Sequence, residues 1–393
     1  MSRSKRPVCV VLGTGSPTGL SILRSMGRHD IPSVGLDARV LTLGSCSRHC
    51  SAAETYRDDE DLLSLLLSLG QAGNHRNLIL CESDQLVLFV DRFRSDLEQY
   101  FHLGFSAQAS VRDIINKKSM VRLAQEAGLT TPVTFSFPET PPGDLKELTP
   151  YPAIVKPLFT QSHYRTKGVI VHDSQGLLRS LEHDRFREGC IVQEVIPGDE
   201  TRLWTCMGYC DNNAVPVALV TGHKLRQRPR DFGLATLAVS RDNATIRKST
   251  ASLLRHLGYA GCFELEFKES ATDGYVFIEA NPRVCSLNEL AVASGVDLPY
   301  LAYCMTCHIP PDCAGPQKDG IHWIDVTRDL DTCLRYYRTS DKGSLRDWAD
   351  RSVTSDAHAV FDRHDLKPFL LDVGKFLAKT VVEFIGLQKA RRE

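Results

Sequence analysis

The chain has 393 residues, of which 42% are apolar and 24% are charged. This composition excludes an intrinsically disordered chain and provides enough apolar residues for two or three folded domains. The 47 basic and 48 acidic residues leave a net charge of −1, which argues against nucleic acid as a partner, because such binders need excess positive charge. No apolar stretch is long enough to span a membrane, and the run at 8–12 is too short for a signal peptide. We therefore expect a cytoplasmic protein.

Strands and helical stretches alternate in the first 112 residues. Apolar runs predict strands at 8–12, 33–36 and 78–81, and helices are expected near 20–28 and 62–69. This order predicts a parallel sheet whose loops gather at the carboxyl edge.

A glycine-rich turn follows the first predicted strand and raises the alternative of a nicotinamide dehydrogenase, with Asp37 on the ribose. Gly13 and Gly15 have the right spacing for that motif, but Gly19 comes one residue too late. Pro17 also lacks an amide that would face a pyrophosphate. We therefore favour a strand-to-helix turn without a dinucleotide.

The order of predicted elements changes from residue 116 onward. Helices are expected at 117–127, near 177–183 and at 244–257, and strands at 153–156, 169–172, 190–196 and in a long stretch that ends at 240. Strands at 262–268 and 275–281, joined by the loop 269–274, predict an antiparallel hairpin.

The hairpin carries the most informative pattern of side chains. Alternation places Glu264 and Glu266 on one face of its first strand, and Glu279 and Asn281 on one face of its second strand. Carboxylates that face one another across an antiparallel pair repel unless a cation lies between them. Two carboxylates and an amide oxygen suit Mg²⁺, and Arg283 follows where it could meet anionic oxygens. The alternative interpretation is an exposed face with solvated glutamates.

Other segments have the chemistry of a nucleotide site. Lys156 ends a wholly apolar strand, so its ammonium group is expected to emerge at the strand terminus. The polar loop 160–168 offers hydroxyl groups, cations and a glycine that could close over phosphates. The strand 190–196 ends in a polar hinge, whose backbone groups could contact an adenine edge.

These motifs, in this order, resemble the ATP-grasp superfamily over roughly residues 113–303, and the first 112 residues are similar to its pre-ATP-grasp domain. The resemblance rests on residues 116–117, 154–157, 192–198, 263–267 and 277–283. It implies an α/β fold in which a Rossmann-like parallel sheet precedes a two-lobed ATP-grasp α+β fold. The implied divisions are the pre-ATP-grasp domain 1–112, the N-terminal lobe 113–188, the C-terminal lobe with the metal site 189–310 and a helical extension 311–393.

The same resemblance implies roles for individual residues. It places Lys117 and Lys156 on the phosphates of ATP, and Arg283 near the γ-phosphate and an acyl intermediate. The implied Mg²⁺ ligands are Glu266, Glu279 and Asn281. The implied contacts in the phosphate loop, in the hinge and at the ribose are Ser162, Gly168, Gln193, Glu194, Val195, Ile196 and Glu200.

Most members of this superfamily join a carboxylate to an amine through an acyl phosphate and release ADP and phosphate. The resemblance therefore implies a ligase that uses ATP, Mg²⁺ and two small-molecule substrates. A biotin-carboxylase-like enzyme that activates bicarbonate is one alternative, and a nucleotide-binding regulator without chemistry is another.

A basic stretch follows the hinge and bears on the substrate. It contains Lys224, Arg226, Arg228 and Arg230. Strand alternation could direct the first three into the cleft, where they would suit an acidic substrate, although a solvated strand edge explains them too. Similar stretches occur in ligases of the D-aspartate ligase type. We predict Lys224 and Arg283 as catalytic residues, and Arg226 and Arg230 as substrate-binding residues.

Thirteen cysteines in a cytoplasmic chain are expected to be buried thiols. Cys304, Cys307 and His308 match the spacing of a haem attachment, and Cys313 lies close enough in the sequence to be a further metal ligand. No second ligand pair accompanies them, so we favour structural cysteines on a buried helix.

The segment 369–387 predicts an amphipathic helix with its charges on one face. We expect it to pack against the body or against a second subunit of a possible homodimer. Binding to a membrane surface is the alternative.

Overall fold

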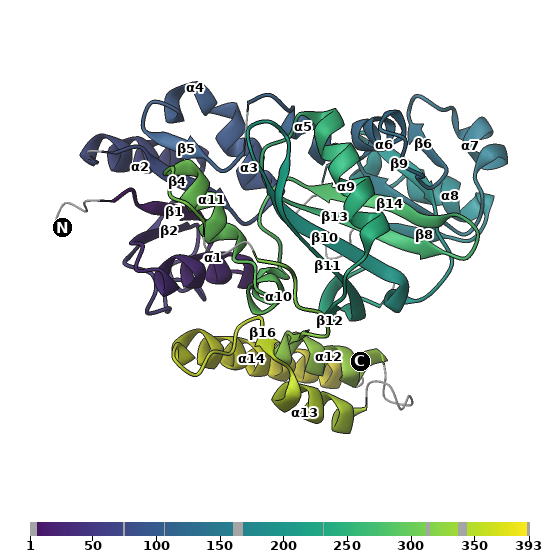
Figure 1. Ribbon diagram of the computed structural model, residues 1–393. Helices are drawn as coiled ribbons and strands as arrows, with labels where there is room; N and C mark the ends of the chain where they lie inside the picture. Colours follow the sequence, from purple (N-terminus) through teal and green to yellow (C-terminus); the bar gives the residue numbers. More distant parts are fainter. Residues whose placement is uncertain are drawn as a thin grey trace.

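The computed structural model describes residues 6–73, 75–105, 107–159, 168–230, 232–311, 315–336 and 344–390, the last eight of them by their backbone only. Figure 1 shows a parallel sheet at one end of the molecule, a large antiparallel sheet in the middle and a small sheet at the other end. Three helices of the C-terminal segment lie beneath them.

The first domain contains the predicted parallel sheet, with strand order β3-β2-β1-β4-β5. Its strands are β1 (Cys9–Leu12), β2 (Ser33–Asp37), β3 (Ala52–Thr55), β4 (Asn77–Cys81) and β5 (Phe101–Leu103). Its helices are α1 (Pro17–Arg28), α2 (Asp59–Ala72), α3 (Asp84–Arg92) and α4 (Arg94–Leu97). The strand order reverses between β1 and β4, and the carboxyl ends of strands at such a point are where open parallel sheets bind ligands.

The small sheet has the strand order β6-β9-β7-β8. Its strands are β6 (Thr134–Phe137), β7 (Ala153–Pro157), β8 (Val169–Val171) and β9 (Cys190–Glu194). The neighbouring helices are α5 (Val111–Ile115), α6 (Lys117–Glu126), α7 (Pro142–Leu148), α8 (Ser174–Leu181) and the 3-10 turn η1 (Asp184–Phe186). Strand β9 pairs with β6 and β7, so the predicted boundary between residues 188 and 189 wrongly separates it from its own sheet.

The large sheet has seven strands in the order β14-β13-β10-β11-β12-β15-β16. Its strands are β10 (Leu203–Cys210), β11 (Pro216–Arg228), β12 (Leu234–Ser240), β13 (Gly261–Ser270), β14 (Gly274–Asn281), β15 (His322–Ile324) and β16 (Ala357–His358). The helices nearby are the 3-10 turn η2 (Glu200–Arg202), α9 (Ala244–Leu257), α10 (Asn288–Ala293) and α11 (Leu298–Thr306). One apolar core joins this sheet to the first domain, because it contains Leu12 of β1 together with Phe263 of β13.

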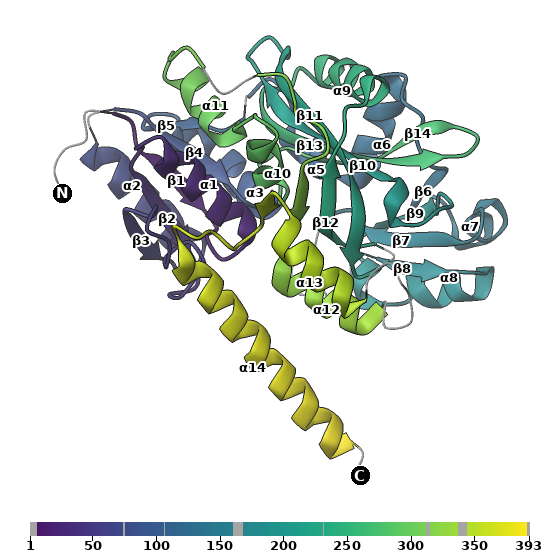
Figure 2. The ribbon, with the colours of Figure 1, turned by 60° about the horizontal axis from the view of Figure 1, so that its bottom comes forward.

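The C-terminal segment is more than the helical extension that we predicted. It contains α12 (Val326–Tyr336), α13 (Leu345–Thr354) and α14 (Leu366–Ala390), but its strands β15 and β16 complete the large sheet. The start of α14 is anchored to the first domain, because Nε of the buried Arg24 contacts Oδ2 of Asp365 at 3.1 Å. Figure 2 shows the far end of α14 leaving the body.

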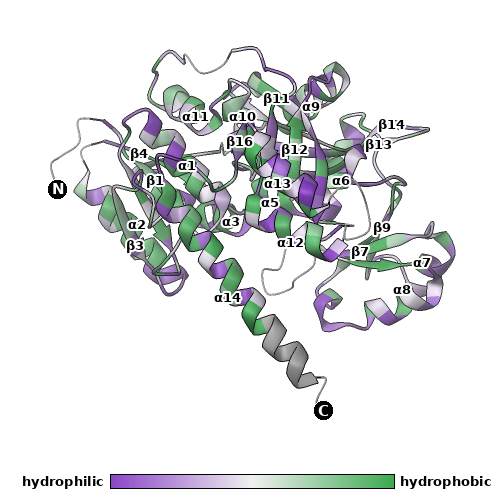
Figure 3. Ribbon diagram, turned by 90° about the horizontal axis from the view of Figure 1, so that it is seen from below, coloured by the Kyte–Doolittle hydropathy of each residue, from purple (hydrophilic) through white to green (hydrophobic). Residues whose placement is uncertain are grey.

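The amphipathic character predicted for α14 is visible in Figure 3, where apolar and polar residues alternate along the helix. Phe376 and Lys379 face a cavity of the body, whereas Leu370 and Leu377 are more than half exposed. Among the described residues, no helix combines the length and the apolar character that crossing a bilayer requires.

The cysteines of the described residues are all free thiols, and most are buried. Cys304 lies in α11 and is fully buried, and burial raises the pKa of Cys307 at the end of that helix. Cys313 lies outside the described residues. The absence of a haem or zinc site here stays a prediction.

Candidate functional site

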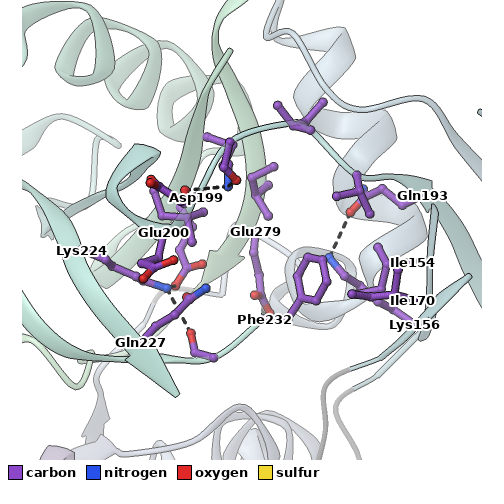
Figure 4. A pocket seen from close by; sticks show the side chains of 18 of the residues that line it. Ile154, Lys156, Ile170, Gln193, Asp199, Glu200, Lys224, Gln227, Phe232 and Glu279 are labelled. Carbon is purple, nitrogen blue, oxygen red and sulfur yellow. Dashed lines mark hydrogen bonds and ion pairs between the residues drawn. The ribbon is translucent and has the colours of Figure 1, made fainter. Parts of the chain in front are cut away.

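A cavity of about 440 Å³ lies between the small sheet and the large sheet (Figure 4). The predicted site residues that line it are Lys117, Lys156, Gln193, Glu194, Val195, Ile196, Glu200, Lys224, Arg230, Glu266 and Glu279. The fold therefore brings most of the residues predicted for the phosphates, the hinge and the metal around one cavity.

Lys156 is held at the cavity wall by a chain of hydrogen bonds. Its Nζ donates to Oε1 of Gln193 at 3.0 Å, and Nε2 of Gln193 donates to Oγ1 of Thr134 at 3.1 Å. Both Lys156 and Gln193 are buried, on the adjacent strands β7 and β9. Lys117 begins α6 at the same wall, where its amide donates to the carbonyl of Leu158 at 3.0 Å. Gln193 is therefore a positioning residue for one of the two lysines.

The hinge after β9 is fixed by its own backbone. The amide of Glu194 donates to the carbonyl of Val133 at 2.8 Å, and the amide of Val195 donates to the carbonyl of Pro152 at 3.0 Å. The carboxylate of Glu194 accepts from the amide of Val133 at 3.1 Å. Since these amides are engaged, Ile196 is the hinge residue best suited to donate to a ligand.

The hairpin has the predicted register where its carboxylates lie. Glu266 of β13 is opposite Glu279 of β14, and Glu264 is opposite Asn281. Nδ2 of Asn281 donates to Oε2 of Glu264 at 3.1 Å, which leaves Oδ1 directed toward Arg283, whose Nη2 donates to it at 3.2 Å. Glu266 and Glu279 with this amide oxygen offer hard oxygen donors at one end of the hairpin, and such a donor set fits Mg²⁺.

Figure 4 shows Lys224 across the cavity from Lys156 and Gln193. Nζ of Lys224 contacts Oε1 of Glu266 at 3.1 Å and the carbonyl of Gly233 at 3.3 Å, and its side chain is buried. A cation in contact with one of the facing carboxylates reduces the repulsion between them. The prediction that Lys224 faces the cleft is confirmed.

The same prediction is wrong for Arg226 and Arg228. The register of β11 against β12 shifts between Lys224 and Arg226, because Leu225 is an extra residue that forms a β-bulge, and it shifts again after Arg226, where the extra residue lies on β12. A bulge inserts one residue and turns the side chains beyond it to the other face. As a result Gln227 lines the cavity with Lys224, whereas Arg226 does not. Arg230 also lines the cavity, but it lies beyond the end of β11.

The arginines beyond the bulge bind the C-terminal helices. Arg226 is almost fully buried, and its guanidinium group donates to both carboxylate oxygens of Asp329 on α12 and to Asp347 on α13. Arg228 forms an ion pair with Asp331 on α12. These contacts attach α12 and α13 to the large sheet, so the substrate-binding role predicted for Arg226 is replaced by a structural one.

Two residues were predicted in the phosphate loop, and the described wall of the cavity includes only residues outside that pair. Ser162 falls outside the described residues. Gly168 packs against β7, where an added Cβ atom would come within 2.7 Å of the carbonyl oxygen of Val155. The small size of Gly168 is therefore explained by the approach of two strands.

The cavity also contains residues that the sequence did not single out. Phe232 follows the basic stretch, and Figure 4 shows its ring beside Lys156, Ile154 and Ile170 of the opposite sheet. Apolar side chains of this kind enclose a flat ring in ligand sites. The position of Phe232 in the sequence did not indicate a role in the site, because the two sheets come together only in the folded molecule.

Arg283, which follows the hairpin, contacts the first domain. Nε of Arg283 donates to Oδ1 of Asp84 at 2.7 Å, and Asp84 begins α3 directly after β4. Glu82 directly follows β4 and accepts a hydrogen bond from Oγ of Ser16 in the turn after β1. The carboxyl edge of the parallel sheet, at its reversal of strand order, therefore adjoins the end of the hairpin that carries Asn281.

The glycine-rich turn is explained by contacts within the first domain. The amides of Thr14 and Gly15 both donate to Oδ2 of Asp37 at 2.8 Å. Gly13 has a φ of 81°, and an added Cβ atom there would strike the side chain of Glu82. Asp37 therefore orders the turn itself, which supports the interpretation of a turn without a dinucleotide.

Glu82 has unusual electrostatics for a carboxyl group. Burial, together with the negative charge of Asp37, raises the pKa of Glu82 from 4.5 to about 7. The positive charges of Arg39 and Arg283 offset only part of this rise. Glu82 can therefore exchange a proton near neutral pH.

We expect Glu82→Gln to stabilise the fold in a pH-dependent way. The folded-state pKa lies above the ordinary value, so the parent loses stability as the pH rises from about 4.5 to about 7. Urea unfolding at pH 8 should give a free energy of unfolding about 1–3 kcal/mol higher for the variant, and the difference should vanish below pH 4.5. An equal difference at both pH values would show that Glu82 has an ordinary pKa.

Comparisons with known proteins come from sequence and from structure. No family model matches the chain. A D-aspartate ligase from Enterococcus faecium is 22% identical over 255 residues, so the match spans 61% of this chain and 61% of that curated relative. A carboxyaminoimidazole ribonucleotide synthase from Aspergillus clavatus, complexed with ATP, has a TM-score of 0.64 at 14% identity and covers 84% of this chain and 87% of its own.

A biotin carboxylase from Campylobacter jejuni, solved as a β,γ-ATP complex, has a TM-score of 0.61 at 14% identity. That match covers 80% of this chain and 74% of the carboxylase. At these identities the similarity to the solved structures is a similarity of fold.

Proposed function

We propose that this chain, which belongs to the ATP-grasp superfamily, is an ATP-dependent ligase that joins a carboxylate to an amine and releases ADP and phosphate. The observation that carries the proposal is the convergence of Lys156, the hinge at Ile196 and the facing carboxylates Glu266 and Glu279 on one cavity. Those positions are the ones that the sequence motifs predict for ATP and Mg²⁺.

The nucleotide would lie between the two sheets. Ile154, Ile170 and Phe232 provide apolar contacts for the adenine ring, and Ile196 would bind its edge. Glu200 is buried beside the hinge, where it would accept hydrogen bonds from the ribose. Lys117 and Lys156 would neutralise the phosphates of ATP, and the hairpin carboxylates line the same cavity.

Mg²⁺ would be held by Glu266, Glu279 and Oδ1 of Asn281. When bound, Mg²⁺ supplies positive charge that offsets the charge developing on a transferring phosphoryl group. Arg283 would lie next to that group, since it contacts Asn281 on one side and Asp84 on the other. Burial alone would lower the pKa of Arg283, but the negative charges of Asp84 and Glu264 raise it, so the guanidinium group stays charged.

The proposed reaction has two steps. A carboxylate oxygen of the substrate attacks the γ-phosphorus of ATP, and the bond between this phosphorus and the oxygen that bridges to the β-phosphate breaks. The products of this step are ADP and an acyl phosphate. The amine nitrogen then attacks the acyl carbon, and phosphate departs with the bonding electron pair. Glu82 would take the proton of the amine, because its pKa of about 7 suits a base at neutral pH.

The substrates are small molecules, and an acidic one would suit Lys224 and Arg230 at the far wall of the cavity. We place the enzyme in the cytoplasm, where ATP is supplied. A homodimer is proposed as well, because the exposed apolar residues Leu370, Leu377 and Val381 of α14 could pack against a second copy.

Binding of the nucleotide is tested by thermal unfolding. Mg-ATP should raise the melting temperature of the parent by mass action, and Lys156→Ala should largely abolish the rise. Lys146→Ala is the matched control, because Lys146 is exposed on α7 of the same lobe and should leave the rise unchanged. An equal rise for Lys156→Ala and the parent would contradict the phosphate assignment.

The chemistry is tested by a screen for phosphate release with carboxylates crossed with amines. An amide, ADP and phosphate are the expected products. Phosphate release that requires bicarbonate and no amine would instead favour a biotin-carboxylase-like reaction. Binding of Mg-ATP without turnover in every mixture would favour a regulator.

A further inference from the structure

A second cavity, of about 300 Å³, lies where α14 passes the first domain. Its walls come from the turn after β1, the end of β11, the start of α12 and the body-facing side of α14. Figures 1 and 2 show α14 starting beneath the first domain and running past α12. The volume is at the lower end of the range for small-molecule sites.

The wall of this second cavity is positively charged. Its cations come from three elements: Arg228 of β11, Arg328 of α12, and Lys375 and Lys379 of α14. The carboxylates in the wall are Asp325 and Asp372, and Arg228 also pairs with Asp331 of α12, so the cations leave an excess of one positive charge. Cations that converge from separate elements favour an anion between them.

The carboxylates of the wall are engaged by protein groups. Oδ2 of Asp325 contacts Nη1 of Arg328 at 3.2 Å. Asp372 accepts a hydrogen bond from Oγ1 of Thr327, and burial together with the charge of Asp325 raises the pKa of Asp372. Asp372 also lies within electrostatic reach of Lys375, so it offsets part of the positive charge of this wall.

The second cavity adjoins the groups that would carry out the reaction. Ser16 lines it and donates a hydrogen bond to Glu82. Glu82 in turn lies within electrostatic reach of Arg283, which contacts Asn281 of the hairpin. A molecule whose reacting group lies at Glu82 would thus extend past Ser16 toward α14.

We propose that the second cavity binds an anionic group of the amine-bearing substrate, a phosphate or a carboxylate that is remote from the reacting amine. This inference rests on the proposed function, because it assigns the second cavity to a substrate of that reaction. It makes Lys375 and Lys379 specificity-determining residues and α14 part of the substrate site.

The binding test uses the full chain saturated with Mg-ADP, so that the first cavity is filled. Melting temperatures are measured against increasing sn-glycerol 3-phosphate, propionate or glycerol at constant ionic strength. We expect glycerol 3-phosphate, propionate or both to stabilise the protein, and neutral glycerol at the same concentration to have no such effect. The phosphate and carboxylate arms show which anion the cavity prefers.

The double variant Lys375→Ala/Lys379→Ala should raise the concentration for half-maximal stabilisation at least tenfold and leave the affinity for Mg-ADP unchanged. Lys367→Ala is the matched control, since Lys367 is exposed on the same helix and does not line the cavity. Lys375→Arg should retain binding, which separates a charge effect from a loss of packing.

Two outcomes would overturn the proposal: no stabilisation by either anion, or equal stabilisation of the parent and the double variant. The test is independent of turnover. Anion binding that depends on the two lysines would support this inference even if the ligase screen fails. If the ligase activity is confirmed but the double variant binds anions like the parent, only this inference is refuted.

Discussion

Glu279→Gln should lower the turnover of the ligase reaction by about 100- to 1,000-fold while the affinity for ATP falls much less. Glu279 faces Glu266 across the hairpin and lines the cavity. The substitution keeps the shape of the side chain and removes one negative charge from the proposed metal site. Positive charge at that site matters most when charge develops on the transferring phosphoryl group, so the loss appears chiefly in kcat. Steady-state kinetics and the ATP-dependent rise in melting temperature measure the two effects.

The control for this variant is Glu269→Gln on the same hairpin. Glu269 accepts a hydrogen bond from Nε1 of Trp204 at 3.3 Å, which glutamine can retain, and it does not line the cavity. Its turnover should equal that of the parent. Full activity of the Glu279→Gln variant would show that the hairpin carboxylate Glu279 has no role in the reaction.

Arg226→Ala should lower the free energy of unfolding by about 3–5 kcal/mol, because it leaves the buried carboxylate of Asp329 without its cation. The side chain of Asp329 is fully buried, and that of Arg226 is 5% exposed. Urea unfolding at neutral pH measures the loss. The expected effect is large because an isolated buried charge costs much more than an exposed one.

Arg57→Ala is the control for this loss. Arg57 pairs with Asp61 at the surface, where its side chain is 85% exposed, so its removal should leave the unfolding midpoint unchanged. If Arg226→Ala unfolds like the parent and instead raises KM for a substrate, Arg226 faces the cleft and the structural role is wrong.

Local pattern was enough to predict the elements that hold the candidate site. Alternation in β13 and β14 gave the pairing of Glu266 with Glu279, because strand periodicity fixes which residues share a face. The helix α9 has the predicted bounds, and Gly258 ends it with a φ of 62°. Lys156 was correctly expected at a strand end because the residues before it are continuously apolar.

Features that depend on long-range contacts could not be predicted in this way. The bulge at Leu225 reverses the faces of Arg226 and Arg228, and nothing in the local sequence marks an extra residue in the strand. The contact of Arg283 with Asp84 joins residues 199 positions apart. Strands β15 and β16 are so short that only their partners in the large sheet define them.

The most direct test of the proposed reaction follows the oxygen atoms of the carboxylate. With a productive carboxylate and amine from the screen, and with ¹⁸O in the carboxylate, one labelled oxygen should appear in the released phosphate. This transfer follows from attack of the carboxylate on the γ-phosphorus and from loss of phosphate in the second step. Mass spectrometry of the phosphate and of the nucleotide distinguishes the outcomes. Label in AMP, or unlabelled phosphate beside a labelled amide, would contradict an acyl phosphate and with it the central claim.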